Sequence, residues 1–214
     1  MGAFVCSDML KNAAEALAAS GCRCLVLGAS GALGTVMLQL LRKHKAHVTA
    51  VCSGGNAETV KRMGADEAVD YTAAESFGEQ LKSAKGFNVV FDFVGGKEVE
   101  RGAGPLLGPG GKYVTAVGGL QNIGDRQLSC GEWFGQLLSI MCGCFSGRSY
   151  KYVMSGAYPP LKAEQWQAAA VEAGARAAIA EEVPFAEAPL RAALKRVASH
   201  HPGGRVVINL EKAV

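Results

Sequence analysis

The stretch Cys22-Arg23-Cys24-Leu25-Val26-Leu27-Gly28-Ala29-Ser30-Gly31-Ala32-Leu33-Gly34-Thr35 decides the fold. Its first six residues are mostly apolar and β-compatible, which predicts a buried strand. A glycine-rich turn follows at Gly28–Gly34, and residues 35–45 show the apolar spacing of a helix. A helix that starts directly after such a turn presents open backbone amides and the positive end of its dipole, which favours an anion such as a phosphate.

Strand and helix patterns then alternate along the chain, as in βαβ units of a parallel sheet. A helix is expected at 8–17 before the first strand. Further strands are expected at 47–52, 68–71, 87–92 and 112–117, and helices at 57–63, 76–85 and 97–107. After Gly118 we expect an apolar segment at 133–144, helices at 162–173 and 188–199, and strands at 179–185 and 205–210. The pattern predicts an α/β fold, a doubly wound parallel sheet of the Rossmann type with three αβα layers.

Composition excludes several classes of protein. The chain has 214 residues, of which 49% are hydrophobic and 19% charged, and its net charge is only +3. These values fit a globular domain and not a disordered chain. No block of basic residues indicates nucleic-acid binding. The longest uncharged apolar stretch, 133–145, is shorter than the roughly 20 residues of a membrane-spanning helix, and no secretory signal is expected.

The cysteines indicate a reducing compartment inside the cell. There are seven, and several, such as Cys22, Cys24, Cys52 and Cys142, lie within apolar runs. This placement predicts buried thiols and no disulfide framework. The Cys22-x-Cys24 and Cys142-x-Cys144 pairs are far apart in sequence, so we expect no zinc site.

The glycine turn is the main candidate site. Its spacing, G-x-x-G-x-x-G, places Ala29 where the usual dinucleotide motif has its first residue, yet the strand before it and the helix after it are the context that such a motif requires. The alternative is a turn that is glycine-rich only for helix–sheet packing. We favour binding of a nicotinamide dinucleotide.

The end of the second strand favours NADP(H) over NAD(H). An NAD site usually carries Asp or Glu there, whereas this chain has Ser53-Gly54-Gly55-Asn56. Ser53 and Asn56 can donate hydrogen bonds to a 2′-phosphate, and Lys61 and Arg62 can add positive charge if their helix faces the site. In the alternative, Ser53 only caps the next helix.

An ordered set of segments resembles the zinc-independent quinone-oxidoreductase branch of the medium-chain dehydrogenase/reductase superfamily, in particular the reticulon-4-interacting-protein-like mitochondrial NADPH oxidoreductases. The segments include the glycine turn, Ala46–Ser53, Gly64-Ala65-Asp66 with Val69-Asp70-Tyr71, Phe91–Gly96, Tyr113-Val114-Thr115, Met154-Ser155-Gly156, Glu172-Ala173-Gly174, Val183-Pro184-Phe185 and Gly204–Asn209. The resemblance runs from about Leu25 to near the end of the chain.

The resemblance implies roles for particular residues. Within the turn Gly28–Gly34, the residues Ser30, Gly31, Ala32 and Leu33 would cradle the pyrophosphate, with Gly28 and Gly34 on either side. Ser53 and Tyr71 would lie at the adenosine 2′-phosphate, near Asn56, where many reductases of this branch place a lysine. Val94, Gly95, Val117 and Gly118 would flank the nicotinamide. It implies hydride transfer from NADPH to a quinone or an activated alkene, and it favours the mitochondrial matrix, with the cytoplasm or a plastid as alternatives. No side chain stands out as a proton donor, so the catalytic residues are unknown.

The resemblance also implies a GroES-like catalytic domain that this sequence lacks. Residues 1–214 are expected to form one NAD(P)-binding domain, and about 178–214 resemble the segment that returns to the catalytic domain. The sequence is then a piece of a longer protein, a chain completed by another subunit, or a reduced homologue. A non-catalytic Rossmann subunit, structural or cofactor-sensing in a larger assembly, is the alternative function.

Other candidates are weaker. Tyr158 and Lys162 match a short-chain reductase pair, but Pro159 and Pro160 prevent the shared helix that such a pair needs. His200-His201, His44 and His47 are expected on the surface. Asp92 either orients a ribose or binds loop amides. The apolar residues of 133–141, namely Trp133, Phe134, Leu137, Leu138, Ile140 and Met141, are expected in the core or at a homodimer edge.

Overall fold

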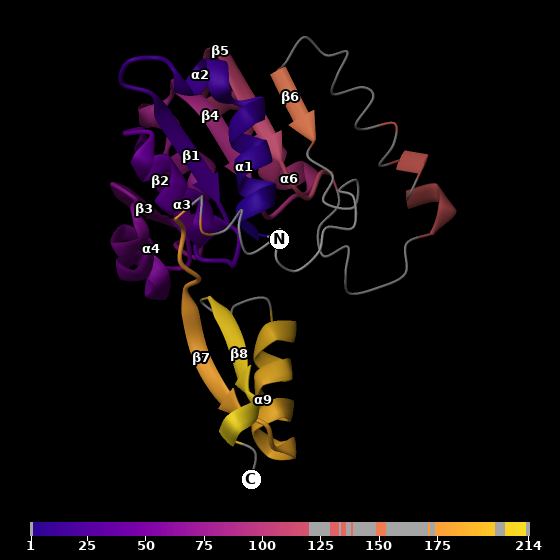
Figure 1. Cartoon of the computed structure of the whole chain (residues 1–214). Helices are drawn as coiled ribbons and strands as arrows, with labels where there is room; N and C mark the ends of the chain where they lie inside the picture. Colours follow the sequence, from indigo (N-terminus) through magenta and orange to yellow (C-terminus); the bar gives the residue numbers. More distant parts are fainter. Residues whose placement is uncertain are drawn as a thin grey trace.

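The computed structural model describes residues 2–119, 129–132, 134–135, 138, 149–152, 171, 174–199 and 204–212. Its main body is a parallel sheet of six strands in the order β3-β2-β1-β4-β5-β6 (Figure 1). The strands are β1 (Arg23–Leu27), β2 (His47–Cys52), β3 (Glu67–Asp70), β4 (Phe87–Asp92), β5 (Leu107–Thr115) and β6 (Ser149–Tyr152). This order is the one typical of dinucleotide-binding sheets, and it reverses between β1 and β4. The predicted Rossmann-type fold is confirmed.

Helices cover both faces of this sheet. One face carries α1 (Gly2–Asn12), α2 (Ala14–Leu17), α3 (Gly34–Lys43) and α4 (Ala57–Met63), and the other carries α5 (Phe77–Gln80) and α6 (Lys97–Ala103). The strands alternate between the two resulting cores. Val26 of β1 packs in the core under α1 and α3, whereas Leu25 and Leu27 pack in the core under α5 and α6. Three layers follow from this period of two, because each central strand is apolar on both sides.

The helical boundaries differ from the prediction in three places. The first helix begins at Gly2, well before Asp8, and stops at Asn12, whose Nδ2 donates to the Asp8 carbonyl at 2.9 Å. Asparagine competes in this way with helical hydrogen bonding, so α2 is a separate turn. The helix expected at 76–85 is only α5 plus the 3₁₀ turn Lys82–Ala84, and the one expected at 97–107 is α6 followed by the 3₁₀ turn Gly104–Leu106.

Two strands also differ from the prediction. β5 begins at Leu107, but its pairing with β4 jumps from Phe87↔Leu107 to Val89↔Lys112, so the regular part starts at Lys112 as expected. Pro109, which has no N–H to donate, lies inside this irregular stretch. β6 was not predicted, because Ser149-Tyr150-Lys151-Tyr152 has no apolar run.

The end of the chain forms a second, two-stranded parallel sheet. β7 (Ile179–Pro184) pairs with β8 (Arg205–Asn209), and α9 (Glu187–Ala198) connects them (Figure 1). The three elements match the predicted ones to within one residue. Backbone groups of Arg176, just before β7, hydrogen-bond the Gln39 side chain of α3 at 2.7 and 2.8 Å.

Several expected features lie wholly or mostly outside the described residues: the helix at 162–173, the segments that hold Cys142, Cys144 and Met154–Gly156, Tyr158 with Lys162, and His200-His201. Of the apolar residues at 133–141, only Phe134 and Leu138 are described, and both are exposed. Within the described part of the chain, no helix is long and apolar enough to cross a membrane.

Candidate functional site

The carboxyl ends of β1 to β5 bring the predicted site residues to one edge of the sheet. The glycine turn follows β1, Ser53 and Asn56 follow β2, Tyr71 follows β3, Val94-Gly95 follow β4, and Val117-Gly118 follow β5. Ligands of open α/β sheets bind at this edge, beside the point where the strand order reverses. Here that point lies between β1 and β4, so the glycine turn and the Val94 loop flank it.

The glycine turn is packed too closely for side chains at two positions. Gly28 has φ +71°, a conformation that favours glycine, and a Cβ added there would lie 3.0 Å from Val94 Cγ2. A Cβ added at Gly34 would lie 2.3 Å from the Gly28 carbonyl oxygen and 2.6 Å from Ala29 Cα. Gly34 therefore lets α3 begin directly against the turn.

The turn is held by its own backbone. The amide of Gly31 donates to the Gly28 carbonyl at 3.1 Å, and the amide and hydroxyl of Thr35 both donate to the Gly31 carbonyl at 3.0 Å. No side chain caps the first turn of α3 at Leu33, so its amides are not taken by a capping oxygen. Ala32 is exposed. This part of the edge has the backbone character of an anion-binding turn.

The loop after β2 is ordered by side-chain hydrogen bonds. Asn56 Nδ2 donates to Ser53 Oγ at 2.9 Å, and Ser53 makes no capping hydrogen bond to the helical turn that follows it. The interpretation of Ser53 as only a helix cap is therefore wrong. Its neighbour across the sheet is the end of β3, because Cys52 pairs with Asp70, and the Tyr71 side chain that follows is 43% exposed.

The Asp70 side chain also orders the loop after β2, a role that was not predicted from the sequence. Its carboxylate accepts hydrogen bonds from the amide and hydroxyl of Thr72 at 2.8 and 2.6 Å, and it also accepts the Gly54 amide. These donors, Thr72 first, lower the pKa of Asp70 below its ordinary value. The sequence pattern held no signal for this role, because the place of Asp70 beside Gly54 depends on its pairing with Cys52 across β2 and β3.

Lys61 and Arg62 are engaged on their own helix. Lys61 Nζ lies 3.6 Å from a Glu58 carboxylate oxygen, and Arg62 donates to the Thr59 hydroxyl at 3.3 Å. Neither is seen to contact Ser53 or Asn56. The two side chains that were expected to add positive charge near a 2′-phosphate therefore interact with other residues of α4 instead.

Asp92 and Thr115 order the two loops after β4 and β5. Asp92 is only 2% exposed, and one of its oxygens accepts the amides of Val94 and Gly95, both at 2.9 Å. Its other oxygen accepts the Tyr113 hydroxyl at 3.0 Å. Of the two roles predicted for Asp92, the structure shows the binding of loop amides. Buried polar groups need such partners, and here all of the observed ones are protein groups.

Thr115 repeats the arrangement one strand along. Its hydroxyl oxygen accepts the amides of Val117 and Gly118 at 3.1 and 2.9 Å. The two loops touch each other, because Gly96 donates to the Gly118 carbonyl at 2.9 Å. A Cβ at Gly95, whose φ is +76°, would lie 2.6 Å from a Val117 methyl group. The two predicted nicotinamide-flanking pairs thus form one compact wall.

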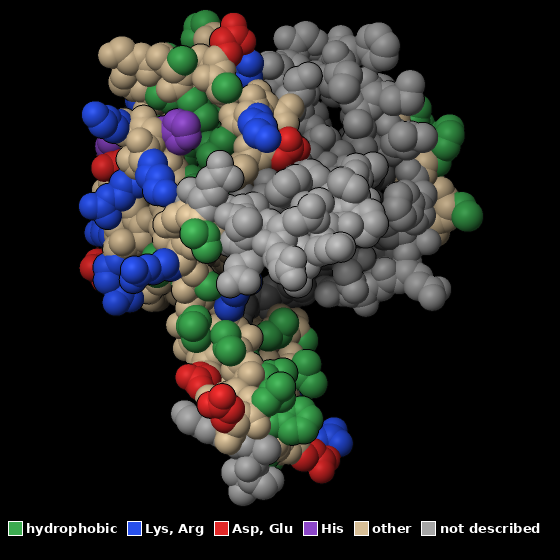
Figure 2. Space-filling model, in the orientation of Figure 1, with side chains coloured by type: hydrophobic (Ala, Val, Ile, Leu, Met, Phe, Trp, Pro, Cys, Tyr) green, Lys and Arg blue, Asp and Glu red, His purple; other side chains and the backbone are tan. Residues whose placement is uncertain are grey.

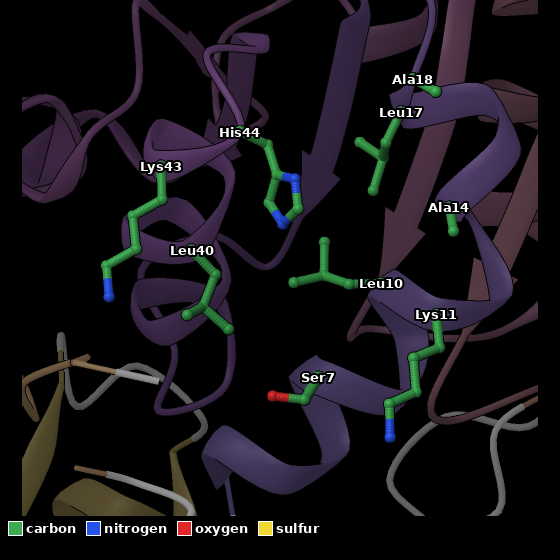
Figure 3. A pocket seen from close by; sticks show the side chains of 9 residues that line it. All are labelled: Ser7, Leu10, Lys11, Ala14, Leu17, Ala18, Leu40, Lys43 and His44. Carbon is green, nitrogen blue, oxygen red and sulfur yellow. The ribbon is translucent and has the colours of Figure 1, made fainter. Parts of the chain in front are cut away.

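A pocket of about 490 Å³ lies away from this edge, between α1, α2 and the end of α3 (Figure 3). Its lining combines leucines with basic side chains, among them Leu10, Leu17, Leu40, Lys11, Lys43 and His44. None of the predicted site residues lines it. The carboxyl edge, with its ordered loops and close glycines, is the better candidate for the nucleotide.

Metal ligands do not gather in the described part of the chain. No group of three or more His, Cys, Asp and Glu side chains there is placed to hold a metal ion. Cys22 and Cys24 are 3% and 0% exposed and face the core under α1 and α2. His47, expected on the surface, is exposed and lies 3.4 Å from Glu67 and 3.7 Å from Asp66.

Comparison with known proteins agrees with this geometry. The family model described as "Zinc-binding dehydrogenase" matches residues 32–153. A mouse (Mus musculus) protein, "NAD(P)H oxidoreductase RTN4IP1, mitochondrial", is 37% identical over an alignment of 199 positions that covers 89% of this chain and 48% of that protein. This chain thus spans about half the length of that relative.

Solved structures share the fold. CurA from Vibrio vulnificus in complex with NADPH matches 98% of this chain and 62% of its own, with a TM-score of 0.69 and 20% identity. The quinone oxidoreductase from Coxiella burnetii matches 94% of this chain and 57% of its own, with a TM-score of 0.66 and 18% identity. The family match covers more than half of the sequence, and the sheet order is that of a dinucleotide-binding domain. This chain belongs to the medium-chain dehydrogenase/reductase superfamily.

Proposed function

We propose that this chain is the NADP(H)-binding part of an oxidoreductase that transfers a hydride from NADPH to a quinone or an activated alkene. The observation that carries the proposal is the carboxyl edge itself, where an uncapped helix start, close-packed glycines and two amide-ordered loops lie side by side. The nicotinamide cofactor, when bound, supplies the hydride. The residues of this chain would bind the cofactor and orient it.

The pyrophosphate would lie against the turn at Ser30–Gly34. Close approach of the backbone requires that no Cβ stand in the way, and the contacts at Gly28 and Gly34 show how little room the turn leaves. The amides at the start of α3 would then donate to phosphate oxygens, with the helix dipole in the favourable direction. The same residues would serve NADH and NADPH equally.

Discrimination between the two cofactors would come from the loop after β2. Ser53 and Asn56 already hydrogen-bond each other, and the exposed Tyr71 ring lies at the end of the neighbouring strand. The absence of an acidic residue at the end of β2 favours the 2′-phosphate of NADPH over NADH. The carboxylate of Asp70 limits this preference, because it stands beside Gly54.

The nicotinamide would lie against the Val94-Gly95 and Val117-Gly118 loops. Asp92 and Thr115 fix these loops before any ligand arrives, which reduces the ordering cost of binding. Hydride transfer needs the donor carbon and the acceptor to be held close together and away from water. The two loops form one wall of such a cleft.

The other wall would come from a GroES-like domain outside this sequence. In support, Figure 2 shows hydrophobic side chains gathered on the surface of the β7–α9–β8 unit. The exposed large hydrophobic residues in and beside this unit include Ile179, Phe185, Leu194, Val197, Ile208 and Leu210. A two-stranded sheet with such a surface is incomplete by itself. We assign this unit to the interface with the missing domain and place the protein in the mitochondrion, as the mouse relative's name states of that protein.

Consumption of NADPH at 340 nm tests the proposal. The chain, alone and joined to a GroES-like domain of its natural protein, is mixed with NADPH or NADH and with benzoquinone, naphthoquinone or an α,β-unsaturated ketone. Faster oxidation with NADPH, dependent on an acceptor and abolished by Gly34→Ala, is the expected result. Tight NADPH binding with no turnover in either form would instead favour a non-catalytic, cofactor-sensing subunit.

A further inference from the structure

Two thiols lie together at the start of the central strand, and the proposed cofactor site does not use them. Cys22 directly precedes β1 and Cys24 is its second residue, so the two side chains point to the same side of the sheet. Their Sγ atoms are 3.8 Å apart. Both belong to the core under α1 and α2.

Sulfur atoms at this distance are in direct contact, which is the arrangement from which a disulfide forms. A disulfide needs an Sγ–Sγ distance of about 2.0 Å and a Cα separation of no more than about 6.8 Å, and residues two apart on a strand are separated by about 6.6 Å. The two sulfurs would have to approach by about 1.8 Å, and the two Cβ atoms would have to come within about 4.5 Å of each other.

The two thiols are chemically unequal. Either sulfur can donate in this contact, which lowers the pKa of Cys22, whereas the same contact and burial raise the pKa of Cys24. The thiolate is the nucleophile in cysteine oxidation. Because Cys22 also directly follows the exposed residues 18–21, whereas Cys24 lies inside β1, we take Cys22 as the attacking sulfur and Cys24 as the resolving one.

Cys22 is buried but directly follows an exposed turn. Residues 18–21 are all exposed, and Cys22 as a whole residue is 3% exposed while Cys24 is fully buried. A small oxidant such as hydrogen peroxide needs contact with only one sulfur. The other buried thiols differ: burial raises the pKa of Cys6 to about 12, and that of Cys52 is also raised, chiefly by burial.

We propose that Cys22 and Cys24 are a peroxide-oxidisable dithiol that closes to a reversible disulfide at the root of β1. The Cys22 thiolate attacks one oxygen of the hydroperoxide, the O–O bond breaks, and Cys22 becomes a sulfenic acid. The sulfur of Cys24 then displaces the hydroxyl group, which leaves as water. In total, two thiols and one H₂O₂ give one disulfide and two H₂O.

The resulting disulfide is expected to be easily reduced. Its loop contains only three residues, so it restricts the unfolded chain little. It also pulls on a strand end that is held in place, because Arg23 N donates to Asn88 Oδ1 and His47 N donates to the Cys22 carbonyl, both at 2.8 Å. Strained disulfides of this kind are the labile ones, so glutathione should restore both thiols.

Peptide mapping of the whole chain tests the proposal. The reduced protein is treated with one equivalent of hydrogen peroxide, unfolded in N-ethylmaleimide, and digested with trypsin, which cuts after Lys11, Arg23 and Arg42. A Cys22–Cys24 disulfide joins peptide 12–23 to peptide 24–42, with a mass about 2 Da below the sum of the two free peptides. We expect this linked pair as the main product, and its loss after treatment with glutathione.

Two variants separate the steps. In Cys24→Ser the sulfenic acid on Cys22 has no partner, so dimedone should label peptide 12–23. In Cys6→Ser, which removes a buried thiol 16 positions away in sequence, the linked pair should form as in the parent.

Full maleimide labelling of both peptides, at a peroxide dose that already oxidises the exposed Cys130, would contradict the proposal. So would Cys22 linked chiefly to any other cysteine. The mapping of the parent protein does not depend on whether either variant folds.

Discussion

Asp92 and Thr115 are register partners at the ends of β4 and β5, and each accepts two backbone amides from the loop that follows its own strand. The same device thus fixes two neighbouring loops at the edge of the sheet. Because Gly96 also donates to the Gly118 carbonyl, the loops support each other. Loss of either acceptor should therefore disturb both.

Asp92→Ala should be strongly destabilising. It removes the acceptor of the Val94 and Gly95 amides and of the Tyr113 hydroxyl, and unsatisfied buried polar groups cost about 1–3 kcal/mol each. We expect the free energy of unfolding to fall by about 2–4 kcal/mol in a urea titration. Tyr113→Phe removes one of these bonds and should cost about 1–2 kcal/mol. A loss below 0.5 kcal/mol for Asp92→Ala would show that these bonds do not hold the loop.

Thr115→Val keeps the shape of the side chain and removes its oxygen. The amides of Val117 and Gly118 then lose their acceptor, so we expect a loss of about 1–2 kcal/mol in stability and weaker NADPH binding. Thr115→Ser is the matched control, because it keeps the oxygen and should stay close to the parent in affinity. A Thr115→Ser protein weakened as much as the Thr115→Val protein would contradict this role of the hydroxyl oxygen.

Gly34→Ala should prevent both correct folding of the turn and nucleotide binding. The new methyl group would lie 2.3 Å from the Gly28 carbonyl oxygen, and backbone cannot move aside as a flexible side chain can. We expect a loss of more than about 2 kcal/mol in stability. Gly55→Ala is the control, since no atom lies within 4 Å of the added Cβ, and its thermal unfolding should match that of the parent.

The Asp70 carboxylate should make the stability of the protein depend on pH. Its pKa is lowered in the folded protein by the Thr72 and Gly54 donors, so its contribution to stability is complete above its unfolded pKa of about 3.9. That contribution is lost as the pH falls through the lowered folded pKa. Asp70→Asn should therefore unfold at a lower temperature than the parent at pH 6, and the difference should close toward pH 3. A constant difference across this range would exclude the carboxylate charge as its cause.

The central sheet could be predicted from the sequence because its strands are short, continuous apolar runs. The predicted limits of β2, β4 and α4 agree with the structure. β6 could not be found in this way, since Tyr150 and Tyr152 alternate with polar residues at an outer strand. The early start of α1 was missed because Asp8 resembles a helix start, although Val5 and Met9 continue the buried face before and after it.

In the candidate site too, residues next to predicted strands could be found from the sequence, whereas contacts between strands could not. The strand pattern pointed to the glycine turn and to Ser53, because each follows directly on a predicted strand, whereas Val94, Gly95, Val117 and Gly118 came from the resemblance. The second role considered for Asp92, binding of loop amides, is observed. The Tyr113–Asp92 bond and the position of Asp70 beside Gly54 depend on pairing between strands, which hydropathy does not encode. The Cys22–Cys24 contact was visible only as a spacing.

The most direct measurement is a calorimetric titration of NADPH and NADH into the chain, repeated with Ser53→Ala. We predict saturable binding of both, with NADPH the tighter ligand. Loss of the Ser53 hydroxyl should weaken NADPH about 3- to 10-fold and leave NADH unchanged. No binding of either cofactor at millimolar concentration, or equal weakening of both by Ser53→Ala, would contradict the assignment of this edge as an NADP(H) site.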